Sequence, residues 1–234
     1  MTDWIHEGEA AIAADPARIA DLFPAAGREV GRGAVRPDDD PQGYRHGTLD
    51  DLARERFVVA LVRALPADRA AAELRELHRY GDDAERRGVL RGLGAAEEAG
   101  GIGAVGASDP TGGDPLVDAG VNLVLDALRA NDPRLVAAAL GPFAARHLDQ
   151  HAWRHGVLKA VFMDLPLDVV AGLDDRADVE LARMAAGLIA ERRAACRTVT
   201  DDMTRLATAP APAAAPAPTD VTAAGDPAGP HQED

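Results

Sequence analysis

Residues 131–197 decide the fold, and they read NDPRLVAAALGPFAARHLDQHAWRHGVLKAVFMDLPLDVVAGLDDRADVELARMAAGLIAERRAACR. Asp132, Asp149 and Asp178 are each placed to cap the N-terminus of a helix. Pro133 follows the first of them, where its missing N–H would be unpaired in any case. The stretch therefore predicts three helices with stops between them.

The middle one of these helices is apolar on two sides. One face carries Trp153, Val157, Ala160 and Val161, and the other carries Leu158 and Phe162. A helix of this kind packs between neighbours rather than on a surface. We therefore expect it to be the centre of the fold.

Apolar residues also recur with helical spacing from the N-terminus to residue 128, with Asp-Pro, Pro or Gly stops. Pro24 is expected to end the second helix, and Thr48 with Asp51 resembles a capping box. No segment predicts a strand. The predicted class is all-α, with helical hairpins stacked as an irregular, HEAT-like α-solenoid, and an irregular helical bundle is the alternative.

One helical domain is predicted over residues 1–206, with flexible loops at 25–47 and 97–113. Residues 207–234 are rich in Ala and Pro and predict a disordered tail. The second loop contains a G-x-G-x-x-G match at 101–106. A helical segment precedes this match, whereas a dinucleotide-binding motif requires a strand there. We therefore do not interpret the match as a nucleotide-binding site.

Composition narrows the function classes. The net charge is −14, with 39 acidic and 25 basic residues, which disfavours nucleic acid and anionic membranes as partners. The single cysteine, Cys196, excludes an internal disulfide. We expect a cytoplasmic protein with neither a signal peptide nor a membrane span. No cofactor is predicted.

Three histidines, His147, His151 and His155, occur at intervals of four residues. Leu148 and Asp149 are expected to separate the first from the other two. His151 and His155 are therefore the best metal-ligand candidates in the chain. Because a zinc site needs three or four ligands, these two do not predict a metal site by themselves. A solvated or partly packed pair is the default interpretation.

Lys159 is the only lysine among the 25 basic residues. A compact ammonium on the middle helix suits acid–base or imine chemistry. The alternative is a lysine with a buried stem that pairs with a carboxylate such as Asp174 or Glu191. The second interpretation is favoured because no other catalytic group is identifiable nearby.

Other charged residues lie beside apolar anchors: Asp174, Arg176, Glu191, Arg192 and Arg197. An inward ion-pair network that braces the last helix would explain them. A binding site for an anionic or polyol ligand, or for a partner, would also explain them. The structural explanation is favoured.

Several segments resemble the EboA-domain family, whose members are often described as metabolite-traffic proteins. They are Trp153–Lys159 with Ala160 and Phe162, Pro166–Leu167, Gly172–Arg176, Leu181–Met184 and Glu191–Arg197, with weaker similarity at 23–32, 80–81 and 85–86. The similarity is strongest over residues 131–199. Trp153, Lys159, Asp174, Arg176, Glu191, Arg192 and Arg197 match the family pattern.

The chain departs from that pattern at three positions. It has Gly141, Ala190 and Cys196 where the family usually has Asn, His and Gly. If a ligand or an acid–base step depends on that asparagine or histidine, this chain has lost it.

The resemblance implies a cytoplasmic helical protein. Its binding partner would be either a protein encoded in the same secondary-metabolite gene cluster or a small metabolite. A membrane protein in such clusters would allow peripheral association with a membrane partner. Our leading hypothesis is a non-catalytic scaffold or metabolite-binding protein that assists processing or export. The alternative is an enzyme of the same pathway that uses Lys159.

Overall fold

The computed structural model describes residues 2–103 and 113–208, in which every extended regular element is a helix. The α-helices are α1 (Thr2–Ala14), α2 (Ile19–Glu29), α3 (Leu49–Ala64), α4 (Ala67–Tyr80), α5 (Asp83–Glu98), α6 (Pro115–Ala127), α7 (Pro133–Ala139), α8 (Pro142–His147), α9 (Gln150–Phe162), α10 (Leu173–Arg176), α11 (Val179–Ala194) and α12 (Asp201–Ala207). The 3-10 helices are η1 (Pro16–Arg18) and η2 (Leu167–Val169). The predicted all-α class is confirmed.

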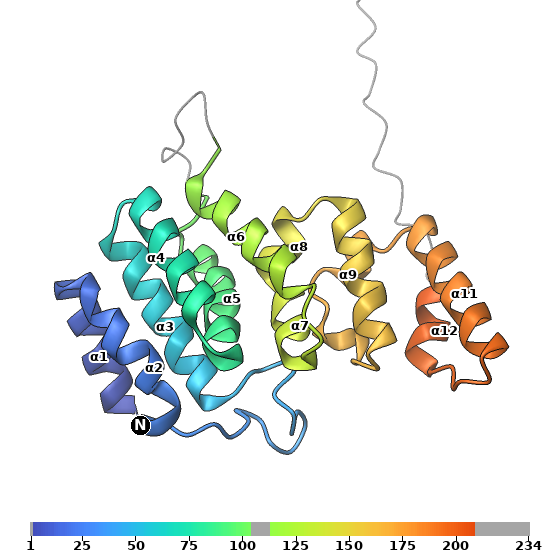
Figure 1. Cartoon of the computed structure of the whole chain (residues 1–234), viewed down its shortest axis with the longest axis horizontal. Helices are drawn as coiled ribbons and strands as arrows, with labels where there is room; N and C mark the ends of the chain where they lie inside the picture. Colours follow the sequence, from blue (N-terminus) through green and yellow to red (C-terminus); the bar gives the residue numbers. More distant parts are fainter. Residues whose placement is uncertain (1, 104–112, 209–234) are drawn as a thin grey trace, which may run out of the picture.

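The helices follow one another in chain order along the long axis, from α1 at one end to α11 and α12 at the other (Figure 1). The most extensive helix pairing joins α3 to α5, and α1 packs on α3. The main helical neighbours of α9 are α7 and α11. Our expectation that α9 is the centre of the fold is therefore wrong, because α3 and α5 have that role.

The second apolar face of α9 is also not packed as expected. Trp153 and Val157 on the first face are fully buried, but Phe162 on the second face is 51% exposed. Leu158 is only partly buried. Helical spacing identified two apolar faces, but it carried no information about whether a neighbour covers the second one.

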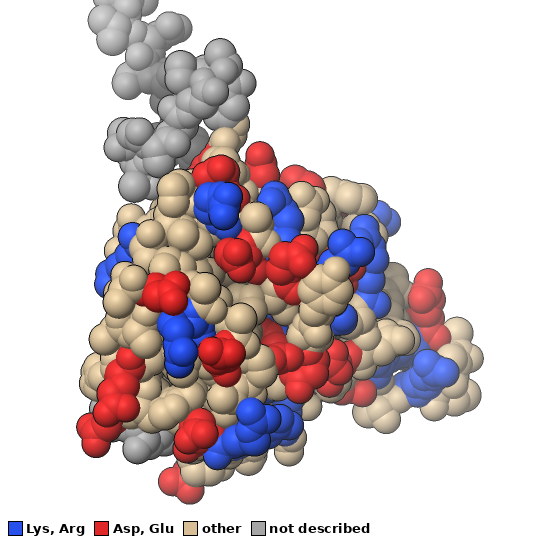
Figure 2. Space-filling view, turned by 60° about the vertical axis from the view of Figure 1, so that its left-hand side comes forward, with Lys and Arg blue, Asp and Glu red and all other residues tan. Residues whose placement is uncertain are grey.

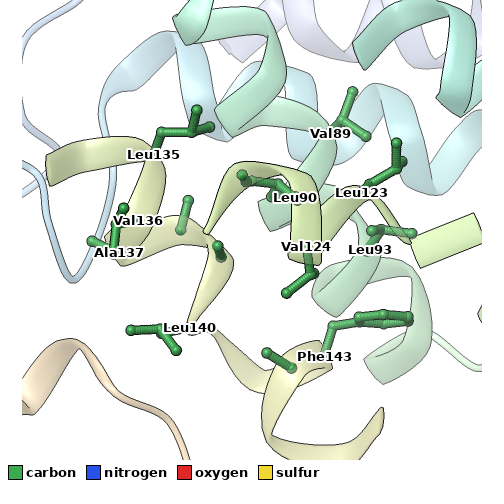
Figure 3. Packing of buried hydrophobic residues seen from close by; sticks show 14 of the residues in the cluster. Val89, Leu90, Leu93, Leu123, Val124, Leu135, Val136, Ala137, Leu140 and Phe143 are labelled. Atoms are coloured by element: carbon green, nitrogen blue, oxygen red, sulfur yellow. The ribbon is translucent and has the colours of Figure 1, made fainter. Parts of the chain in front are cut away.

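One continuous hydrophobic core runs through the molecule, with buried side chains from α1 to α12 in a single cluster. Figure 3 shows its middle, where Leu90 and Leu93 of α5, Val124 of α6 and Phe143 of α8 lie close together. A Cβ added at Gly120 of α6 would lie 2.3 Å from the Phe143 ring. Helices α6 and α8 are therefore packed against each other at close range.

Aspartate caps begin the helices as predicted. The carboxylates of Asp132, Asp149 and Asp178 accept backbone N–H groups three residues ahead at 2.8, 2.8 and 2.9 Å. The stretch contains more helices than the three expected. The first expected helix is divided into α7 and α8, because Gly141 and Pro142 form the N-terminus of a new helix.

Pro24 does not end the second helix, and this prediction is wrong. It lies inside α2, which continues to Glu29. A proline inside a helix costs about 3 kcal/mol. Phe23 and Ala26 on either side are fully buried, and their burial offsets that cost.

The connection from α2 to α3 is held by one aspartate and one arginine. Asp40 accepts the backbone N–H groups of residues 44–46 at 2.7–3.0 Å. Burial acts to raise the pKa of Asp40, but these hydrogen bonds outweigh it and lower the pKa. Arg91 of α5 donates to the carbonyls of residues 43–45. The end of the predicted loop 25–47 is thus tied to α5, and its first five residues belong to α2.

The surface carries both signs of charge. Figure 2 shows basic side chains scattered among acidic ones on the face that includes the N-terminal helices, without a continuous basic patch there. Within residues 2–103 and 113–208, no helix combines the length and the apolar character needed to cross a bilayer. Most of the predicted tail (209–234) and most of the second predicted loop (104–112) lie outside the described residues.

Candidate binding groove between α9 and α11

Two arginines join α9 to α11, one near each end. Arg154 of α9 donates to the carboxylate of Asp178, the N-cap residue of α11, through Nε at 3.0 and 3.1 Å. Arg192, near the end of α11, donates to the carbonyl of Phe162 at 2.7 Å and to Asp164 Oδ1 at 3.2 Å. The first contact joins the N-terminal parts of the two helices, and the second joins their C-terminal ends. The two helices therefore run in the same direction.

A groove of about 640 Å³ lies between these two attachments. Its apolar walls are Leu158 and Phe162 of α9, Met163 directly after α9, and Met184 and Leu188 of α11. Its polar residues are Asn131, His155, Lys159, Arg183 and Glu191. The four-residue intervals on each helix place these side chains on the two facing sides. The groove is therefore long, mainly apolar and polar at a few points.

Gly187 lies in the groove lining, in the middle of α11. A Cβ added there would meet no atom within 4 Å. Glycine in a helix interior costs about 1 kcal/mol relative to alanine. No close packing requires this glycine, and its missing side chain leaves the centre of the groove open.

Lys159 contributes an ammonium group to the groove wall. Its Nζ donates to the backbone carbonyl of Leu128 at 2.7 Å. Among the described residues it forms no ion pair with Asp174 or Glu191, so the expected carboxylate partner is wrong. Since an ammonium has three hydrogens, this contact leaves two for other acceptors.

Arg176 and Asp174, two residues apart, have different surroundings. Arg176 donates to the carbonyls of Ala144, Ala145 and Leu148 at 2.7–3.2 Å, and its guanidinium lies 4.8 Å from the ring centroid of Trp153. Burial lowers its pKa from the ordinary value. Asp174 has a 95% exposed side chain, 3.9 Å from Arg205. Arg176 thus ties α10 to α8, whereas Asp174 faces solvent.

The last three residues of the predicted set also separate. Arg192 forms the attachment to α9 and donates to the carbonyl of Thr198 at 3.1 Å. Glu191 lines the groove, and Arg197 is exposed. Among the described residues the five predicted side chains do not form one ion-pair network with each other. Arg192 pairs with Asp164 and Asp174 lies 3.9 Å from Arg205, while Arg176 and Arg192 donate mainly to backbone carbonyls.

The histidines divide as predicted. His147 belongs to α8 and lies 2.7 Å from Glu97, whereas His151 and His155 stand one turn apart on α9 with ring centroids 4.5 Å apart. Nowhere in residues 2–103 and 113–208 do three or more His, Cys, Asp or Glu side chains gather as metal ligands. The pair is a partly solvated wall of the space beside Lys159.

Glu55 was missed by the sequence analysis. It is a partly buried residue of α3 that lines a second cleft, of about 480 Å³. Burial raises its pKa to about 7; Arg91 opposes the rise, and the charges of Asp51 and Glu98 add to it. The available signal was that α3 has charged residues on several sides. A helix that packs on α1, α2, α4 and α5 must bury some of them.

Comparison with known proteins bears on the half that contains the groove. Residues 124–208 match the model of a family described as metabolite traffic protein EboA. We call these residues the EboA segment. The match covers less than half of the chain and encloses the predicted stretch 131–199, so the resemblance is confirmed. No curated protein and no solved structure matches the chain.

Every lining residue of the groove lies in the EboA segment. The second cleft is different, because Glu55, Arg91 and Glu98 come from the preceding helices while Gly141 and Asp168 come from the segment. The groove is therefore a feature of the segment alone, and the cleft lies at its boundary.

Proposed function

We propose that the protein is a non-catalytic, solenoid-like helical scaffold that binds a small amphipathic metabolite in the groove between α9 and α11. The family description, metabolite traffic, supports a carrier role for a protein containing an EboA segment. The observation that carries the proposal is the open centre of the groove at Gly187, between apolar walls.

The chemistry of the walls defines the ligand class. An apolar body would contact Leu158, Phe162 and Leu188, and burial of such surface supplies about 25 cal/mol per Å². An anionic or carbonyl oxygen would accept from the free hydrogens of Lys159. Glu191, four residues after Gly187, repels an anion at the other side of the groove and thereby orients the ligand.

This role fits a scaffold that presents its ligand to a partner encoded in the same cluster. The groove is open along one side, with Phe162 51% exposed, so a partner could reach the ligand without unfolding the array. Peripheral association with a membrane-embedded partner would place the groove next to the site where the metabolite leaves.

The test uses 1-anilinonaphthalene-8-sulfonate, a fluorescent probe with an apolar body and one anionic group. Gly187→Phe should fill the groove without a clash and weaken probe binding about tenfold or more, which is the loss of about 1.4 kcal/mol. Ala186→Phe adds the same ring at the adjacent exposed position and is the matched control. Lys159→Met should weaken binding several-fold.

Equal probe affinity in Gly187→Phe and Ala186→Phe would refute binding in the groove. A borohydride-trapped adduct on Lys159 with a carbonyl metabolite would instead support the enzyme alternative, since His155 stands one turn away in the same groove. Turnover without such an adduct would also contradict a non-catalytic role.

A further inference from the structure

The second cleft, at the boundary of the EboA segment, is not used by the proposed function. It lies between α3, α5, the segment 44–46, the α7–α8 junction and η2. Its apolar lining includes Leu90, Ala95, Ala137, Pro142 and Val169. Its ionisable lining consists of Tyr44, Arg45, His46, Glu55, Arg91, Glu98 and Asp168. An apolar wall therefore faces a group of charged side chains.

The arginines of this cleft are already engaged. Arg45 bridges Asp39 and Asp168 at 2.9 and 2.7 Å. Arg91 donates to the carbonyls of residues 43–45 and has its Nε 3.6 Å from Asp51. The positive charges thus hold the loop and η2 in place and are not available to a ligand.

The glutamates are not engaged in the same way. Within the described residues, neither Glu55 nor Glu98 forms a hydrogen bond or an ion pair. Glu55 is partly buried in the cleft, and Glu98 is exposed beside it. A poorly hydrated carboxylate without a partner is stabilised strongly by a cation that approaches it.

We propose that this cleft binds a small organic cation, a primary ammonium on an apolar body, with Glu55 as its counter-ion and Glu98 as a second acceptor. The three hydrogens of an ammonium suit two carboxylates on neighbouring helices. Leu90, Val169 and Pro142 supply the wall for the apolar body. A bare metal ion fits less well, because the described residues offer no group of three ligands here.

Proton linkage gives the proposal a specific signature. With a pKa of about 7, about half of the Glu55 carboxyls carry a proton at pH 7. Arg91, Asp51 and Glu98 face this carboxyl together with His46, Arg45 and Asp168 of the cleft. A bound cation favours the ionised form, so binding at pH 7 should release up to about half a proton per ligand.

The experiment is calorimetric titration of the full chain with cyclohexylamine, which is a cation at pH 7, and with cyclohexanol as its neutral isostere. Titration in two buffers of different ionisation enthalpy measures the released protons. Cyclohexylamine should bind at least about tenfold more tightly than cyclohexanol. Glu55→Gln should abolish that preference and the proton release. Glu76→Gln, at an exposed position of α4, removes the same charge and should change neither.

Absence of cyclohexylamine binding would overturn the proposal. Equal binding of amine and alcohol, retention of the preference in Glu55→Gln, or proton uptake on binding would each do the same. Gly187→Phe should leave cyclohexylamine binding unchanged, so failure of the groove proposal and failure of this one are separate results.

Discussion

Replacement of Glu55 by glutamine should make the protein more stable above neutral pH. The carboxyl is partly buried in the second cleft, and burial is the largest cause of its raised pKa. Glutamine has nearly the same shape and no proton to lose. The variant therefore isolates the effect of ionisation from the effect of packing.

The sign and size follow from the pKa values of the two states. Below pH 4.5 Glu55 is protonated in both the folded and the unfolded chain, so its ionisation changes nothing. Between 4.5 and about 7 the unfolded chain ionises first, and the free energy of unfolding falls. Above 7 the loss reaches at most about 3 kcal/mol, at 1.36 kcal/mol for each tenfold change in proton affinity.

Urea denaturation of the wild type and Glu55→Gln between about pH 4 and 8 measures this difference directly. The two proteins should be about equally stable at the acid end, and the variant should gain up to about 3 kcal/mol at the alkaline end. Glu76→Gln, which removes the same charge from an exposed position of α4, should not reproduce this gain. Parallel pH curves for wild type and Glu55→Gln would refute the reasoning, because they would mean that water already solvates the ionised carboxylate.

Four further changes test other parts of the structure. Trp153→Ala should lower the free energy of unfolding by about 3–5 kcal/mol in denaturant titrations, because the indole is fully buried; a near-neutral result would contradict its role in the core. Cys196→Gly should raise it by about 1 kcal/mol, since Cys196 has φ +53°; an unchanged value would mean that this backbone is not strained. Gly187→Ala should raise the melting temperature through about 0.5–1 kcal/mol of helix propensity, and a fall would show that the groove is filled. Arg154 holds the pKa of Asp178 at about 2, below its ordinary value of 3.8. The ion pair therefore stabilises the folded protein above pH 3.8, and this contribution is lost as the pH falls toward 2. Asp178→Asn should flatten acid unfolding followed by circular dichroism, and an unchanged acid limb would contradict the ion pair.

Local chemistry predicted the starts of helices, because a cap involves only residues a few positions apart. Asp132, Asp149 and Asp178 each bond to an N–H three residues ahead, so the sequence contains both partners. Pro24 shows the limit of this logic. Its local cost is overcome by burial of Phe23 against distant helices, which no local pattern reports.

The candidate sites were predictable only in part for the same reason. Lys159 was noticed because its residue type is unique, but its hydrogen-bond partner is a backbone carbonyl 31 residues away. Every residue has a backbone carbonyl, so the sequence could not show which one accepts this hydrogen bond. Glu55 had no distinctive feature of its own, although Asp50 and Arg54 of the same helix form a fully buried ion pair at 2.6 Å. A helix with charges on several sides indicates such burial without saying which charge meets a cavity.

The three departures from the EboA pattern have different structural meanings. Cys196 occupies the left-handed position that ends α11, where the N–H of Arg197 returns to the carbonyl of Arg192 at 2.8 Å. Glycine is the residue that such a helix end favours, so this departure concerns backbone strain and not a ligand. Ala190 is exposed on α11 and lines neither the groove nor the cleft.

Gly141 is the departure that bears on binding, because it both begins α8 and lines the second cleft. An asparagine there would cap α8 and place an amide beside the space that Glu55 also lines. Glycine forms no side-chain cap, and it leaves that volume to a ligand. Compared with asparagine, glycine at position 141 lowers the stability of α8 by about a few tenths of a kcal/mol and leaves more space in the cleft. If the cleft binds an ammonium ligand, Gly141→Asn should reduce the size of the apolar body that it accepts, while binding in the groove at Gly187 stays unchanged.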